Sequence, residues 1–148
     1  DTMIMIPYPY PRESVNNWIR YLMSSFESGT AIEYAVFLKG DEPIYIGNAG
    51  FVTVSQKHLS AEIGYFIDEA YANQGYATEA CERLLHLGFH THLFNRVYAR
   101  CMARNIASQR VLKKIGMRHE GRFLQEFKKY NQFEDIDYFA ILKHEYTL

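Results

Sequence analysis

A glycine turn between a strand pattern and a helix pattern is the part of this sequence best suited to binding a ligand. Ile63, Tyr65 and Ile67 alternate with other residues as in a half-buried strand, and small or apolar side chains recur at helical spacing from Ala77. The period changes across Asn73-Gln74-Gly75. A helix that begins after small residues points unpaired backbone N–H groups and the positive end of its dipole outward. This segment therefore predicts an anion site, with phosphate as the expected ligand.

Side chains able to move protons occur at several positions. Glu62 precedes Ile63 on the same strand and faces the opposite way, and Glu126 falls on a later strand. Ser108 follows Asn105, a residue type that caps helices. A carboxylate can accept a proton and a hydroxyl can donate one. Polar strand faces and an ordinary helix cap would account for the same residues, so their chemistry depends on where the fold places them.

A metal site is not expected. His86 and His90 share one helix face, but no Glu follows His86 as in zinc proteases, and no third ligand can be placed.

The elements that must position these residues follow one another without a linker or repeat. Prolines at positions 7, 9 and 11 favour an extended start, and apolar residues at i, i+3, i+4, i+7 then predict an amphipathic helix that ends near Gly29. The remaining patterns predict strands at 32–38, 44–54, 63–67, 96–102, 117–127 and 134–143, with helices at about 74–92 and 105–116. This order predicts an α/β (α+β) fold with a mixed, mostly antiparallel central sheet covered by helices.

Length and composition limit the class of protein. With 148 residues the chain fits a single domain, 1–148, large enough to fold without a metal or disulfide. Sixteen basic and 17 acidic residues leave no overall charge for nucleic acid, and no apolar run is long enough to span a membrane. Cys81 and Cys101 lack the spacing of a zinc site or a disulfide scaffold, so we expect reduced thiols in a cytoplasmic protein.

Two motifs in this order resemble the GNAT superfamily of acetyl-CoA-dependent N-acetyltransferases, and within it the RimJ/RimL ribosomal-protein N-terminal acetyltransferases. The first is Ala-Glu-Ile-Gly-Tyr at 61–65 leading to Asn-Gln-Gly-Tyr-Ala-Thr-Glu-Ala at 73–80. The second is Asn-Ile-Ala-Ser at 105–108 leading to Val-Leu-Lys-Lys-Ile-Gly-Met at 111–117. The resemblance covers nearly the whole chain and implies a sheet that is splayed at the cofactor strand, with helices on both faces.

The resemblance assigns a role in acetyl-CoA binding to residues from both motifs. The pantetheine arm would pair with strand backbone beyond a bulge at Gly64, with an N–H near Tyr65 or Phe66 facing the oxyanion. The pyrophosphate would lie on the amides of the glycine turn, Asn105 would hold the pantetheine amide, and a basic residue of the following helix would meet the 3′-phosphate. The expected acetyl-CoA contacts are Tyr65, Phe66, Ile67, Gln74, Gly75, Tyr76, Ala77, Thr78, Asn105, Ser108, Arg110 and Lys113.

The same resemblance suggests the catalytic groups. Glu62 is the first candidate for the base that deprotonates the amine, and Glu126 is the second. Many GNAT enzymes place a tyrosine where this chain has Leu112. Ser108 is therefore the expected donor to the leaving thiolate.

The sequence departs from the family's phosphate-loop pattern at Ala72, where Gln or Arg is usual, and at Asn73, where Gly is common. A first strand and helix of relatives would precede Asp1. The acceptor is expected to be a protein or peptide α-amine. A small amine and a non-catalytic acyl-CoA-binding regulator are the alternatives, and a homodimer through exposed strand edges is reasonable.

Overall fold

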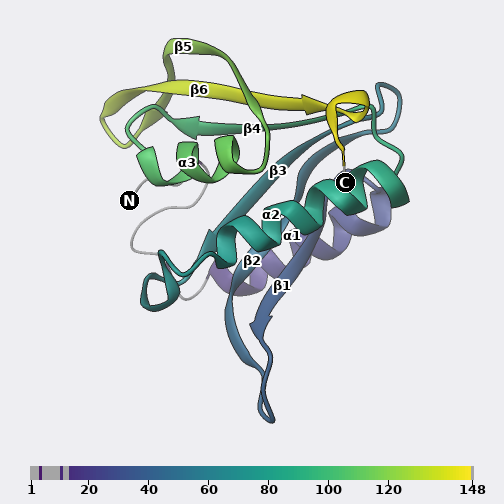
Figure 1. Ribbon diagram of the computed structural model, residues 1–148. Helices are drawn as coiled ribbons and strands as arrows, with labels where there is room; N and C mark the ends of the chain where they lie inside the picture. Colours follow the sequence, from purple (N-terminus) through teal and green to yellow (C-terminus); the bar gives the residue numbers. More distant parts are fainter. Residues whose placement is uncertain (1–3, 5–10, 12–13, 148) are drawn as a thin grey trace.

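The computed structural model describes residues 4, 11 and 14–147, and in this part of the chain six strands form one mixed sheet in the order β1-β2-β3-β4-β6-β5 (Figure 1). The strands are β1 (Ile32–Leu38), β2 (Ile44–Ser55), β3 (Ser60–Ile67), β4 (Arg96–Met102), β5 (Arg118–Lys129) and β6 (Gln132–Leu142). Only the β3–β4 pair is parallel. The predicted mixed, mostly antiparallel sheet is confirmed. The predicted extended start at 1–11 falls outside the described residues, apart from residues 4 and 11.

Three α-helices in the described residues match the predicted helical segments. They are α1 (Ser14–Ser28), α2 (Tyr76–His86) and α3 (Ile106–Lys114), and α2 continues as a π-helical turn, Leu87–Thr91. Gly29 and Gly116 follow α1 and α3 with φ of 68° and 87°. Because a left-handed residue ends a helix most easily when it is glycine, these two positions explain where the helices stop.

The core lies between the sheet and the pair α2 and α3. Phe51, Val97 and Phe139 point from three strands toward Leu85 of α2 and Leu112 of α3, and each of these five side chains is at most 1% exposed. Figure 1 shows α1 crossing the β1–β3 side of the sheet on the face opposite α2. Helices therefore cover both faces, as the resemblance implied.

The parallel strands β3 and β4 pair over only a short distance. Three residue pairs join them, Ser60 with Arg96, Ala61 with Val97 and Glu62 with Tyr98. Beyond these pairs the strands diverge, and α2 and α3 both begin toward the open end (Figure 1). The predicted splay at the cofactor strand is thus present.

The bulge lies on a different strand from the one we predicted. Glu62 and Ile63 are consecutive on β3, but they pair with Thr53 and Phe51 of β2, so the extra residue is Val52. A Cβ at position 64 would approach the Val52 side chain to 2.7 Å. The prediction of a bulge at Gly64 is therefore wrong. Gly64 is small because the bulged valine of the neighbouring strand lies against it.

Candidate active site

The N-terminus of α2 offers backbone N–H groups that no side chain caps. Gly75 is the N-cap residue with φ of 92°, and it makes no side-chain cap hydrogen bond. The first helical bond runs from the Glu79 N–H to the Gly75 carbonyl at 3.0 Å. The amides of Tyr76, Ala77 and Thr78 therefore have no carbonyl of the preceding turn to bind.

Space for a phosphate is open at this turn. A Cβ built on Gly75 would meet no atom within 4 Å, and both Gln74 and Gly75 are exposed. Asn73 has φ of 60°. Asparagine adopts this left-handed conformation more readily than most residues, which explains how it replaces the glycine that is common there. The predicted turn thus fits a pyrophosphate through its backbone.

The β3 backbone beyond Glu62 has an edge without a partner strand in the described chain. The Asp68 N–H donates to the Ile46 carbonyl of β2 at 2.8 Å, and the Phe66 carbonyl lies against Gly47 of β2. Because backbone groups alternate between the two edges of a strand, Phe66 faces β2 and Tyr65 directs its N–H and C=O into the splay. Of the two expected oxyanion donors, the geometry favours the Tyr65 amide.

Two hydroxyl groups meet across the splay. The Tyr65 Oη of β3 lies 2.8 Å from the Ser108 Oγ of α3 and 3.4 Å from the Ser108 carbonyl oxygen. Asn105 caps α3, since its Oδ1 accepts the Ser108 N–H at 3.1 Å. Leu112 is fully buried in the core. The hydroxyl available at this point therefore comes from Ser108, with the Tyr65 phenol beside it.

Cys101 is the second neighbour of the Ser108 hydroxyl. Burial, and then the negative charge of Asp137, raise the pKa of the Cys101 thiol to about 11, while its hydrogen bond with Ser108 opposes this shift. The thiol is thus protonated at neutral pH. It is a neutral neighbour to whatever Ser108 binds.

A hydrogen-bonded row joins the two candidate bases on the other face of the sheet. Arg100 of β4 binds both carboxylate oxygens of Glu62, at 2.8 and 3.1 Å. Arg100 also hydrogen bonds to the Tyr138 hydroxyl of β6, which donates to Glu126 at 2.7 Å. Glu62 is 6% exposed, whereas Glu126 is exposed. The hydrogen bond between Arg100 and Glu62 is the main reason why the pKa of Arg100 is raised.

The remaining basic residues near these elements divide into two groups. Arg96 of β4 forms an ion pair with Glu120 of β5, and Arg104, which follows β4, forms one with Glu134 of β6. Arg110 and Lys113 are exposed on α3, as a contact with a 3′-phosphate requires.

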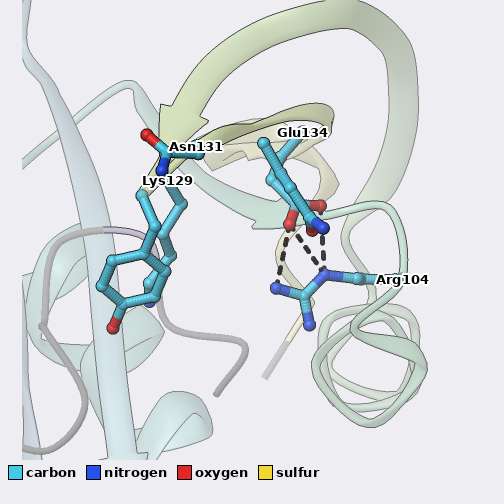
Figure 2. Close-up of a pocket in the computed structure, with 6 residues that line it drawn as sticks. Arg104, Lys129, Asn131 and Glu134 are labelled. Atoms are coloured by element: carbon cyan, nitrogen blue, oxygen red, sulfur yellow. Dashed lines mark hydrogen bonds and ion pairs between the residues drawn. The ribbon is translucent and has the colours of Figure 1, made fainter.

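A cavity of about 610 Å³ lies where the β5–β6 turn meets the segment that leads into α3. In Figure 2, Arg104 reaches across to Glu134, and Lys129 stands on the other side of the turn. Burial lowers the pKa of Lys129, which is 7% exposed. The lining holds two cations and one carboxylate, together with the side chains of Tyr130, Asn131 and Gln132.

Within the described residues, no helix is long and apolar enough to cross a membrane. No group of three or more His, Cys, Asp or Glu side chains in that part of the chain could hold a metal ion.

The structure brings Tyr65 and Ser108 together across the splay. Glu62 and Glu126 are linked on the opposite face of the sheet through Arg100 and Tyr138, whereas Arg110 and Lys113 stay exposed on α3. Sequence reasoning missed the side chains of Tyr65, Arg100 and Tyr138. The alternation at 96–102 did indicate that Arg100 points away from the core. Its pairing with Glu62 depends on the register between two strands, which no local signal reports.

Comparison with known proteins identifies the class. A family model described as an acetyltransferase (GNAT) domain matches residues 1–118. The chain belongs to this family and is a GNAT N-acetyltransferase, as the resemblance of its two motifs implied.

Individual relatives and solved structures are acetyltransferases of the same kind, and the structures include spermidine N-acetyltransferases as well as ribosomal-protein enzymes. The chain is 40% identical over 117 residues to an uncharacterized N-acetyltransferase, YnaD, of Bacillus subtilis, which covers 79% of this chain and 68% of YnaD. It is 25% identical over 134 residues to the ribosomal-protein-serine acetyltransferase of Escherichia coli, covering 84% and 75%. A structure of RimL, a ribosomal L7/L12 α-N-protein acetyltransferase in complex with coenzyme A, superposes with a TM-score of 0.84 at 20% identity, covering 95% and 78%. Similarity to RimJ/RimL-type proteins is confirmed.

Proposed function

We propose that this protein transfers the acetyl group of acetyl-CoA to the N-terminal α-amine of a protein or peptide by direct attack in a ternary complex. The amine nitrogen attacks the thioester carbon, the C–S bond breaks, and the amine loses a proton while the CoA thiolate gains one. The observation that carries the proposal is the splay between β3 and β4, with the uncapped N-terminus of α2 at its open end. The proposal places acetyl-CoA there.

Each part of acetyl-CoA, from the pyrophosphate to the thioester, would bind a different group of the protein. The amides of Gln74 to Thr78 would hold the pyrophosphate, and the free edge of β3 up to Ile67 would pair with the pantetheine arm. The Tyr65 amide would stabilise the oxyanion, an effect typically worth roughly 2.7–4 kcal/mol per donor. Ser108 would donate a hydrogen bond to the departing thiolate, which stabilises its negative charge.

The contacts of the two carboxylates change their order as candidate bases. Glu62 accepts two bonds from Arg100 and one from the Tyr98 hydroxyl, which leaves about one of its four lone-pair sites. Glu126 accepts one bond, from Tyr138. Because a base needs a lone pair directed at the amine, we propose Glu126 as the base, with Glu62 holding Arg100 in place.

The cavity beside α3 supports a peptide acceptor over a polyamine. The one carboxylate in its lining, Glu134, already forms an ion pair with Arg104, so the lining offers a polycation no carboxylate that is not already bonded. Asn131 and Gln132 side chains could hydrogen bond to a peptide main chain.

The proposal also includes a cytoplasmic location and a homodimer that forms through β5, which is an edge strand of the sheet.

The test is a thiol-release assay with the purified protein, acetyl-CoA, N-terminally free peptides beginning with Ser or Ala, spermidine and free amino acids. We expect release with peptides, and mass spectrometry should place the acetyl group on the α-amine. Release with spermidine alone would support a small-amine enzyme. Tight CoA binding without release for any amine would identify a non-catalytic regulator.

The base is tested by pH profiles of turnover for Glu126→Gln and Glu62→Gln. We expect Glu126→Gln to lose the acidic limb of the profile, because that limb reports protonation of the base. An acidic limb that persists in Glu126→Gln and disappears in Glu62→Gln would reverse the assignment.

A further inference from the structure

The Tyr65 and Ser108 hydroxyls form a bridge between the two halves of the splayed sheet. Their residues are 43 positions apart in the chain, and the Oη–Oγ distance of 2.8 Å is that of a full hydrogen bond. The longer 3.4 Å approach of Oη to the Ser108 carbonyl makes the Oγ the better partner. Tyr65 is half-buried and packs against the core, so its ring has little freedom to turn.

Donor and acceptor in this pair can be assigned by acidity. A phenol is a stronger donor than an aliphatic hydroxyl, and burial raises the pKa of Tyr65, so the phenol keeps its proton at neutral pH. The Ser108 N–H is already bound to Asn105, so the hydroxyl is the group left to act. If Tyr65 donates to Ser108 Oγ, the single serine proton must point toward another acceptor. The neutral Cys101 thiol is the other hydrogen-bond neighbour of this hydroxyl, and a negatively charged CoA thiolate is a stronger acceptor than that thiol.

We infer that Tyr65 is a positioning residue for Ser108: its phenol donates to the serine Oγ and thereby turns the serine proton toward the sulfur of the departing CoA thiolate. This inference rests on the proposed acetyl transfer and adds a side-chain role to a residue whose backbone faces the oxyanion. The phenol neither touches the thioester nor gives up its proton. It orients the serine hydroxyl that hydrogen bonds to the thiolate.

The Tyr65→Phe substitution removes only the phenol oxygen. We expect kcat to fall roughly three- to tenfold, the range of one hydrogen bond, with KM for acetyl-CoA within twofold of wild type. Tyr146→Phe is the matched control, because Tyr146 is also half-buried and its hydroxyl has no hydrogen-bond partner within the described residues. That control should keep wild-type turnover.

A double-mutant cycle separates positioning from general support of the fold. Since Tyr65 acts through Ser108, the double variant Tyr65→Phe/Ser108→Ala should turn over no more slowly than Ser108→Ala. The inference would be overturned if the fold-losses in kcat of the two single variants multiplied in the double variant, or if Tyr65→Phe kept the wild-type kcat. Wild-type protein that releases no thiol with any amine would overturn the proposed function and the inference together, an outcome visible without any variant.

Discussion

Replacing Gly75 with tryptophan tests whether the N-terminus of α2 holds the pyrophosphate. The turn places three helix amides, those of residues 76–78, beside an open approach at Gly75. An indole at this position would occupy the space through which a phosphate reaches those amides. The substitution should therefore remove ligand contacts without changing the donors themselves.

The expected effect follows from the number of amides. A hydrogen bond to a charged group contributes about 1.5–3 kcal/mol. If the indole keeps the phosphate from two of the three amides, the loss of binding free energy is about 3–6 kcal/mol. That free energy corresponds to at least a hundredfold increase in Kd for CoA, roughly tenfold for each 1.4 kcal/mol. Calorimetric titration of the folded variant with CoA measures the change directly.

Backbone strain needs its own control. Gly75 has φ of 92°, so any side chain there strains the turn by roughly 1–2 kcal/mol. Gly75→Ala shares this strain, but its methyl group meets no atom within 4 Å. We expect the alanine variant to bind CoA within about tenfold of wild type. A folded tryptophan variant with wild-type affinity would refute the cradle, and equal losses in both variants would attribute the effect to the backbone.

Three further substitutions give separate readouts. Ser108→Ala should lower kcat about ten- to a hundredfold, the range of one charge-assisted hydrogen bond, and calorimetry should show an unchanged affinity for CoA. A parallel loss of affinity would argue against a role confined to the thiolate. Glu62→Gln should lower the melting temperature by about 4–8 °C, because leaving the Arg100 charge without its carboxylate costs roughly 2 kcal/mol. This figure allows for solvent screening of the Arg100 side chain, which is about one-third exposed. An unchanged melting temperature would mean that the ion pair adds no stability. The Arg122 guanidinium, and then His119, hold the pKa of Asp137 below its usual value, so this carboxylate stabilises the fold above about pH 3.9 and loses that effect as the pH falls through its lower folded pKa. Asp137→Asn should therefore destabilise the protein at pH 7 in urea titrations, and the difference from wild type should vanish in acid; a difference that persists there would contradict this linkage.

Local patterns were sufficient for the elements and for the phosphate turn. Helical spacing and glycine terminators located α1 and α3, and β-strand alternation located 32–38 and 96–102 at the observed bounds. The turn at 73–75 was recognisable because its requirement is local, namely small residues and backbone that can adopt positive φ. Such features depend on neighbours within a few positions of the chain, so the sequence reports them directly.

Tertiary structure alone decided how side chains from different elements meet. The bulge lies at Val52 and not at Gly64, because strand register follows from packing across both strands. Register also places Arg100 against Glu62 and leaves Glu126 the less occupied carboxylate.

The sequence by itself determined a mixed α/β chain with an anion-binding turn and a serine near a helix cap. Only the tertiary structure brought the Tyr65 phenol from β3 to Ser108, 43 residues away. The physical reason is that backbone conformation responds to local sterics and hydrogen bonding, whereas a contact between distant side chains depends on strand register, splay and helix placement together.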